Sequence, residues 1–206
     1  APLPAKLANL LREAKWLALV AAAVYLLLIL ATFNKADPGW SHSATAAVTQ
    51  NAGGRLGAWL SDLMLYLFGV SSYWWVVLCL YVVVWGYRRL DGSALIDPRP
   101  LVIALAGFAV LLLASAALES LRMHTLKAEL PLAPGGLAGD ALGSFVSGAF
   151  GFTGATLALI TLAAVGFSLF TGISWIAAAE FTGLLLEGLV ALARRVRDSR
   201  QDRRLG

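Results

Sequence analysis

Residues 56–87 read LGAWLSDLMLYLFGVSSYWWVVLCLYVVVWGY, a run of 32 mostly apolar residues that decides the fold. As a single helix with a rise of about 1.5 Å per residue, this run would be about 48 Å long, whereas the hydrocarbon core of a bilayer is about 30 Å thick. One crossing cannot use the whole run, so something must break it. The stretch Gly69-Val70-Ser71-Ser72 is the obvious break. It divides an approach helix at residues 53–68 from a membrane span at residues 72–87.

The composition of the whole chain is that of a membrane protein. Of its 206 residues, 59% are hydrophobic and only 14% are charged, whereas a soluble domain carries about 25% charged residues. The net charge of +4 does not indicate a nucleic-acid surface, because the basic residues gather at the ends of apolar runs, where they set topology. The single cysteine, Cys79, excludes a disulfide framework and is interpreted as a small apolar filler.

Three further apolar runs predict membrane spans. Residues 16–33 form an uninterrupted run of 18 residues, about 27 Å of helix, and are interpreted as a retained span because no signal-peptide cleavage pattern follows them. Residues 101–118 and 151–172 are the third and fourth spans. A polar loop follows the first span, and a second is expected to begin at Glu119 and to include Arg122. Tryptophans near the run ends, including Trp74 and Trp75, are interpreted mainly as interfacial anchors.

The two halves of the chain share a glycine frame at a fixed offset of 82 residues. The frame reads GGxxGxxL, then seven residues, then FG, and eight residues of the first half meet identical residues in the second. We therefore expect an all-α membrane fold of two tandem parallel units, at residues 16–87 and 101–172. Each unit would hold a span, an outer loop, a glycine-led approach helix and a return span. The glycines expected to permit close helix packing and the bend into each return span are Gly53, Gly54, Gly57, Gly69, Gly135, Gly136, Gly139 and Gly151.

The distribution of positive charge predicts that both termini face the cytoplasm. With four spans, twelve of the sixteen lysines and arginines lie on the cytoplasmic side, three of them in the segment at residues 1–15. A fifth span at residues 173–193 would move the basic tail outward, so these residues are expected to form a cytoplasmic amphipathic helix, with a basic connector up to residue 206. Side chains expected to meet lipid headgroups and set the topology are Arg88, Arg89, Arg194, Arg195 and Arg197.

No pattern in the sequence predicts catalysis, a metal or a cofactor. The phosphate-binding pattern GxxxxGK[ST] is missing, and the two histidines, His42 and His124, lie in different outer loops without ligand spacing. Asp62 and Asp140 are interpreted as interfacial or capping carboxylates, not as proton-relay acids. We therefore expect a protein that is not an enzyme.

The loop after the first span carries a motif that resembles a known family. Asp37-Pro38-Gly39-Trp40-Ser41 is followed by NAGGRLGAWLSD at residues 51–62 and by Leu67-Phe68-Gly69. These residues are similar to the DP-x-WS and NxGGxxGAxLAD elements of the amino-terminal four-span membrane domain of the bacterial FtsK/SpoIIIE DNA translocases. Ser61 departs from the alanine that is common in the family. TGISW at residues 171–175 also resembles the family's exit from the fourth span, and the resemblance covers about residues 10–195.

The resemblance implies an inner-membrane anchor that places a division protein at the septum, contacts other divisome proteins and tethers a hexameric, ATP-driven DNA motor. The motor's residues have no counterpart in this chain, so direct DNA binding is not expected, while self-association is expected through the family. Trp40 is the best candidate for a partner contact, and an interfacial or loop-packing role explains it equally well. The candidate partner contacts are Asp37, Pro38, Trp40 and Ser41.

Two other classes of protein remain open. The tandem repeat and the glycine-broken helices are also compatible with a small transporter, although a transport path needs polar groups at mid-membrane, and the spans offer few. The basic tail is compatible with a membrane-bound nucleic-acid binder, which predicts strong, salt-dependent DNA binding.

Overall fold

The structure is a computed structural model and describes residues 5–43, 48–88, 99–123, 130–177, 179–180, 182–184 and 187. Over these residues the fold is helical, without a strand, and the all-α prediction is confirmed for them. The elements are α1 (Ala5–Ala31), α2 (Gly54–Phe68), a short 3-10 helix η1 (Gly69–Tyr73), α3 (Trp74–Arg88), α4 (Arg99–Arg122) and α5 (Gly136–Thr171).

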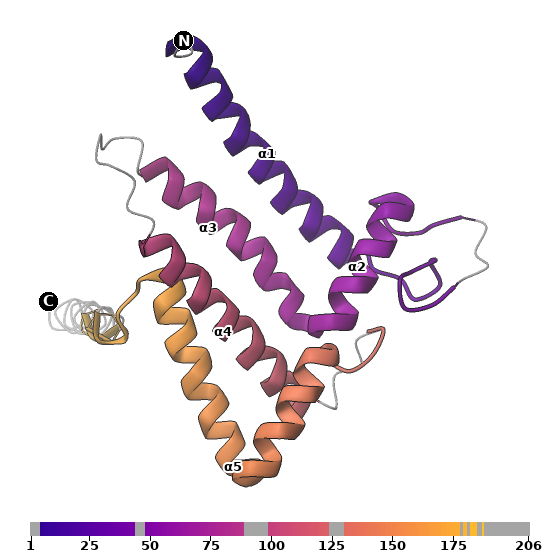
Figure 1. The fold of residues 1–206 in the computed structure, drawn as a ribbon, viewed down its shortest axis with the longest axis vertical. Coiled ribbons are helices and arrows are strands. Elements are labelled where there is room, and N and C mark those ends of the chain that lie inside the picture. The colour runs from indigo at the N-terminus through magenta and orange to yellow at the C-terminus, as the bar shows by residue number, and fades with distance from the viewer. Residues whose placement is uncertain are drawn as a thin grey trace, which may run out of the picture.

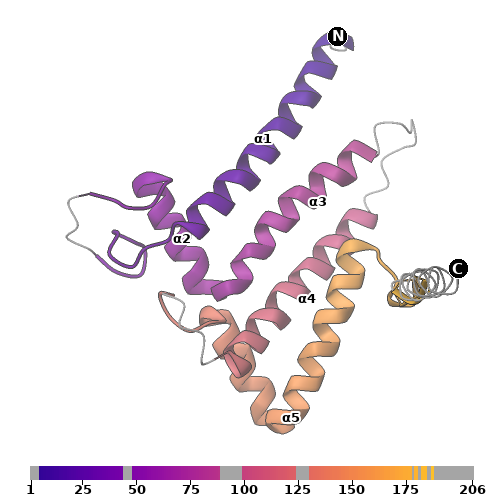
Figure 2. The ribbon, with the colours of Figure 1, turned by 180° about the vertical axis from the view of Figure 1, so that it is seen from behind.

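Four helical stretches of the described chain are long and apolar enough to cross a membrane, as predicted. In Figures 1 and 2, α1, α3, α4 and the second half of α5 run alongside one another, while α2 and the first half of α5 turn away from this direction. These candidate spans are Glu13–Ala31, Gly54–Trp85, Arg99–Arg122 and Gly136–Thr171.

The predicted break in the second apolar run is confirmed. The helix ends at Phe68, and η1 turns the chain into α3. A second bend interrupts α5 at Gly151. Both turning residues have positive φ, 58° at Gly69 and 67° at Gly151, which glycine adopts readily and a residue with a Cβ does not. We call residues Gly69–Tyr73 the first elbow and the bend at Gly151 the second elbow.

The second polar loop begins later than predicted. Glu119 and Arg122 lie in the last turns of α4, and Glu119 is buried. The helix continues past its first acidic residue because the carboxylate of Glu119 finds hydrogen-bond donors on η1. Arg122 is held in the same way, with its Nε donating to Thr156 Oγ1 over 3.2 Å. The expectation that these two residues leave the helix was wrong.

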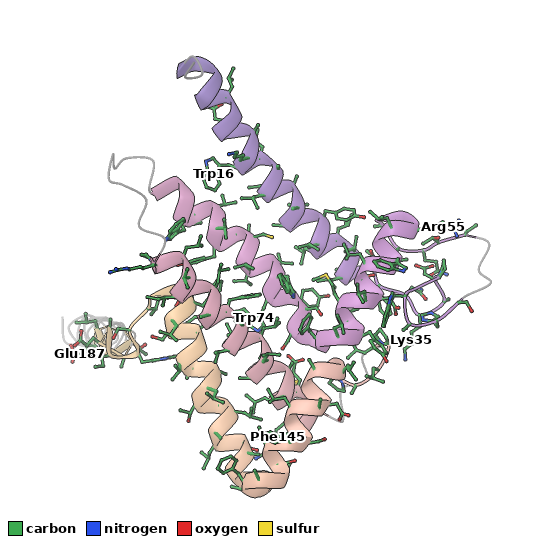
Figure 3. All side chains as sticks on the ribbon, viewed as in Figure 1. Trp16, Lys35, Arg55, Trp74, Phe145 and Glu187 are labelled. Carbon is green, nitrogen blue, oxygen red and sulfur yellow. The ribbon has the colours of Figure 1, made fainter. Side chains whose placement is uncertain are left out.

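Apolar side chains form one cluster in each half and one between the halves. The cluster between the halves places Phe108 of α4 against Trp75 of α3, with ring centroids 5.2 Å apart, and Tyr81 of α3 against Phe170 of α5, 4.7 Å apart. Trp74 lies near the middle of the molecule (Figure 3) and meets Phe167. Trp74 and Trp75 therefore pack between helices, where the sequence predicted interfacial anchors. Aromatic burial of this kind stabilises the contact between the two halves.

Much of the outward surface is apolar, as expected of helices that face lipid. Phe145, on the first half of α5 (Figure 3), is largely exposed. Lys35 and Arg55 lie on the opposite side of the molecule from Glu187 (Figure 3). Of the predicted amphipathic helix, residues 175–177, 179–180, 182–184 and 187 are described and helical.

Candidate functional site

The connection from α1 to α2, residues 32–53, carries the motif and is called the first loop. Asp37 is 2% exposed, and its two carboxylate oxygens accept hydrogen bonds from the backbone N–H groups of Gln50 and Asn51, each over 2.7 Å. A buried carboxylate is stable only when such donors satisfy it, so Asp37 fixes one side of the loop against the other. The structure places Asp37 inside the loop, not on its outer surface.

Asn51 also anchors the first loop, by binding α1. Its side-chain nitrogen donates to the carbonyl of Ile29 over 2.9 Å, and its side-chain oxygen accepts from the N–H of Gly53 over 2.9 Å. Asn51 is buried, and both ends of its amide are used. The amide thus joins the end of α1 to the start of α2. The sequence analysis assigned Asn51 no role beyond its place in the motif.

Asp62 is the second buried carboxylate, and it holds the other part of the first loop. It is 1% exposed and accepts hydrogen bonds from the backbone N–H of Ser41, over 2.6 Å, and from Ser41 Oγ, over 3.0 Å. Asp62 lies within α2, not at its cap, and binds the loop that folds over this helix. The predicted capping role was therefore wrong, while the interfacial position stays a prediction. The loop donors take up the carboxylate, whereas a transport path needs a polar group that is open to the path.

His42 takes part in the same local network. Its Nδ1 lies 3.0 Å from Ser41 Oγ and 3.8 Å from Asp62 Oδ1, and its Nε2 donates to the carbonyl of Lys35 over 2.7 Å. The ring therefore connects two parts of the loop, and its side chain stays 34% exposed. In the described part of the chain no group of three potential metal ligands comes together.

Trp40 projects from this fixed loop. Its side chain is 49% exposed, and one edge of the indole packs on Tyr66 of α2, with ring centroids 5.3 Å apart. Pro38 is half-buried and Ser41 is exposed but bonded to Asp62. Of the four predicted partner contacts, Trp40 is the one that presents a large free surface. A rigid aromatic side chain on an ordered loop is typical of residues that bind other proteins.

A third buried carboxylate ties the first elbow to the second half of the chain. The backbone N–H and the hydroxyl of Ser71 donate to the carboxylate of Glu119, over 3.0 Å and 2.7 Å. Ser115 Oγ lies 2.6 Å from Ser71 Oγ. This cluster was not predicted from the sequence, although an acidic residue at the end of an apolar run and a serine pair in a break are signals of it.

The predicted glycines lie at close contacts and at bends. A Cβ at Gly57 would lie 2.8 Å from Ile29 Cγ2, and one at Gly136 would lie 2.6 Å from the backbone of Gly69. Gly53 also faces Ile29, Gly69 faces Pro134, and Gly135 and Gly139 face Ala116. Gly54 and Gly151 have positive φ and, within the described residues, open space where a Cβ would be.

The predicted headgroup contacts lie largely outside the described residues. Arg88 is the last residue of α3, and its side chain is not described. The others, Arg89, Arg194, Arg195 and Arg197, fall outside the described ranges, as does His124.

Fold and loop together define a class: a helical membrane domain with four potential spans and a first loop held by buried carboxylates. Residues 8–183 match the family described as the 4TM region of DNA translocase FtsK/SpoIIIE. The chain belongs to this family and is a multi-pass membrane domain. No solved structure matches it.

Curated relatives agree with this assignment. The chain is 44% identical, over its whole length, to DNA translocase FtsK 2 of Ralstonia nicotianae, of which it covers 27%. It is 34% identical to DNA translocase FtsK of Shewanella oneidensis over 79% of this chain and 18% of the relative. It is 35% identical to DNA translocase FtsK of Vibrio vulnificus over 81% of this chain and 16% of the relative. The chain thus spans about a quarter or less of the length of these relatives, in the region of the family's membrane domain.

Proposed function

We propose that this domain anchors a septal DNA translocase in the inner membrane and binds other membrane proteins of the divisome. The matched family region and the four potential spans support the anchoring role. The domain would contribute to cell division, and would hold an ATP-driven motor near the septum without performing chemistry itself.

The observation that carries the binding role is the construction of the first loop. Three buried polar side chains, Asp37, Asn51 and Asp62, fix this loop to α1 and α2. Lipid anchoring of one indole does not require such a scaffold, since an exposed tryptophan can sit in the interface on any flexible segment. A preorganised loop lowers the entropy cost of binding a partner. Trp40 would be the central contact, with Pro38 and Ser41 beside it.

Septal localisation tests this proposal. A fluorescent fusion of residues 1–206 should gather at the septum of dividing cells, and Trp40→Ala should abolish most of this enrichment. Trp59→Ala is the matched control, because Trp59 on α2 is similarly exposed, 45% against 49%, and lies outside the loop. A diffuse wild-type fusion, or a Trp40→Ala fusion that still gathers at the septum, would contradict the proposal.

We also propose that the membrane domain, residues 16–172, consists of two tandem parallel units. The backbone supports this arrangement at paired positions 82 residues apart. Gly54 and Gly136 open the two approach helices with φ of 65° and 63°, and Gly69 and Gly151 close them with φ of 58° and 67°. Positive φ is rare enough that two matched pairs in one register favour a repeated unit.

The topology proposed is that both termini lie in the cytoplasm and the first loop outside. The charge count supports it, and the basic residues of the central turn and the tail would meet lipid headgroups. In a Cys79→Ser background, Ser43→Cys in the first loop should react with a membrane-impermeant maleimide in intact spheroplasts. Leu10→Cys near the amino terminus should react only after lysis. The reverse pattern would contradict this topology.

A further inference from the structure

The two units meet inside the chain at one particular joint. The N–H of Val70, in the first elbow, donates to the carbonyl of Pro134 over 2.8 Å. A Cβ at Gly136 would lie 2.6 Å from the N atom of Gly69 and 2.6 Å from the carbonyl carbon of Leu67. The end of α2 therefore sits directly on the start of α5, and Figures 1 and 2 show the two approach helices following one another end to end.

This joint uses a different surface from each unit. The first unit contributes its elbow, and the second contributes the start of its approach helix, which we call the start edge. Each unit should have both surfaces if the units are repeats. The internal joint then leaves two surfaces unused. They are the elbow of the second unit, at Gly151, and the start edge of the first unit, at residues 52–54.

Both remaining surfaces are uncovered. Among the described residues, no heavy atom lies within 4 Å of the Cβ positions at Gly54 and Gly151, other than their neighbours in the chain. Ala52 is exposed at the start edge, and Phe150 and Phe152 flank the second elbow with 67% and 51% of their surface exposed. The guanidinium of Arg122 lies over one face of the Phe152 ring, 4.5 Å from its centroid, and the rest of this ring is free. Ala52 and Phe152 are the positions that correspond, at the offset of 82 residues, to Pro134 and Val70 of the internal joint.

The helices behind the two surfaces also correspond. Gly53 and Gly57 pack on Ile29 of α1, and Gly135 and Gly139 pack on Ala116 of α4, so α1 has the place in the first unit that α4 has in the second. Inside the chain, Trp75 of the first unit's return span packs on Phe108 of α4. Its counterpart, Leu157, is exposed, and α1 presents exposed leucines and valines that a neighbour could cover.

We propose that a second copy of this chain continues the repeat, its start edge docking on the second elbow of the first copy. This inference rests on the tandem-unit proposal and deepens the expected self-association by assigning its surfaces. The contact is heterologous, because the two copies use different surfaces. Parallel units in one membrane are related by an axis along the membrane normal, so repetition of the contact stays in the membrane plane, and we expect it to close into a ring.

Complementarity favours a second copy over another occupant. The start edge and the elbow already fit one another within the chain, down to the hydrogen bond from Val70 to Pro134. A two-fold dimer would instead place elbow against elbow, a pairing for which the chain provides no template. Lipid alone would leave Gly54, at the start edge, without a packing partner.

Disulfide trapping between differently tagged copies tests the proposal. The chain is expressed in a bacterial inner membrane with Cys79→Ser, one copy carrying Ala52→Cys and the other Phe152→Cys, and is oxidised with copper phenanthroline. If residues 152 and 52 of the two copies meet through the same backbone hydrogen bond as Val70 and Pro134, their Cα atoms should lie within the range of about 4.4–6.8 Å that disulfides require. We expect a covalent dimer that contains both tags, at twice the monomer's mass, and a ladder of higher species when one chain carries both cysteines.

Two controls keep the outcomes distinct. Val70→Cys with Pro134→Cys in one chain should form an internal disulfide without a mass shift, and failure of this bond would overturn the tandem joint and the inference together. Ile103→Cys replaces an equally exposed apolar residue, 51%, at the other end of a span, and should not react with Ala52→Cys. If the internal bond forms but the mixed dimer does not, or if Phe152→Cys links to itself instead, the head-to-tail contact is wrong.

Discussion

The first and second elbows turn on glycines of similar conformation and have different surroundings. Both follow a glycine-led approach helix, and both turn on a glycine with φ near 60°, 58° at Gly69 and 67° at Gly151. Pro134 and Gly135 crowd Gly69, and Glu119 binds the Ser71 that follows it. Gly151 has open space around its Cβ position within the described residues. A glycine with positive φ thus makes both bends, while contacts with the rest of the chain stabilise only the first.

The difference between the two elbows shows two separate reasons why a position requires glycine. At the second elbow, glycine is needed for its conformation, because residues with a Cβ rarely adopt positive φ. At the first elbow, glycine is needed also for space, because the backbone of the second unit lies where a Cβ would be. The first elbow is therefore a structural joint of one chain, and the second is a surface that remains available to a neighbour.

Replacement of the two elbow glycines should give the largest effects and the clearest contrast. Gly69→Ala combines strain from positive φ with an overlap at Pro134, and should lower the free energy of unfolding by about 3 kcal/mol or more. Gly151→Ala adds the conformational strain alone and should cost about 1 kcal/mol. Thermal unfolding of purified protein in detergent measures both. Equal losses would show that the crowding at Gly69 has no energetic consequence.

Removal of the carboxylate beside the first elbow should have the next largest effect. Glu119→Ala leaves the N–H of Ser71 without its acceptor in a buried site and leaves the hydroxyl of Ser71 with Ser115 Oγ alone, and should cost about 3 kcal/mol. Glu119→Gln retains one acceptor oxygen and should recover part of the loss. Asp140→Ala removes an exposed acid in the first turns of α5 that accepts one hydrogen bond, from Ser120 Oγ over 3.3 Å, and should cost about 1 kcal/mol or less. Thermal unfolding compares the three variants. If the Glu119→Ala protein is as stable as the Asp140→Ala protein, Glu119 does not stabilise the joint.

A smaller effect is expected in the first loop. Its carboxylate network has no counterpart among the described residues of the second unit. Asp62→Asn weakens the hydrogen bonds from Ser41 and presents an amide donor to a backbone N–H, at a cost of about 1–3 kcal/mol. The loss should be local, so the loop should open while the helices stay folded. Limited proteolysis of the first loop should become faster than in wild type or in Ser43→Ala, which changes an exposed residue of the same loop. An unchanged rate would mean that Asp62 does not hold the loop.

The smallest effect on stability is expected at Trp40. Trp40→Ala removes one aromatic contact, with Tyr66, and should cost about 1 kcal/mol or less, close to the value for Trp59→Ala. A thermal unfolding midpoint that falls well below that of Trp59→Ala would make Trp40 a packing residue of the loop. A loss of septal enrichment at unchanged stability would separate binding from folding.

Much of this architecture could be predicted from periodicity and length, because the bilayer sets the length of a span and glycine marks a bend. The break at Gly69 and the four apolar stretches were predicted on these grounds. The buried acids were not predicted correctly, since Glu119 and Asp62 look like surface residues until their donors on Ser71 and Ser41 are known. These donors lie 48 and 21 residues away in the chain, and no local pattern indicates such pairs. The packing of Trp74 and Trp75 between helices was missed for the same reason.

A reconstruction of the domain in lipid nanodiscs, with the copies in each particle counted, would show how the copies meet. We expect a closed ring in which residues 52–54 of each chain lie against the second elbow of its neighbour, in the geometry of the joint between Val70 and Pro134 within the chain. A monomer, or a two-fold dimer with the second elbows facing one another, would rule out the head-to-tail contact.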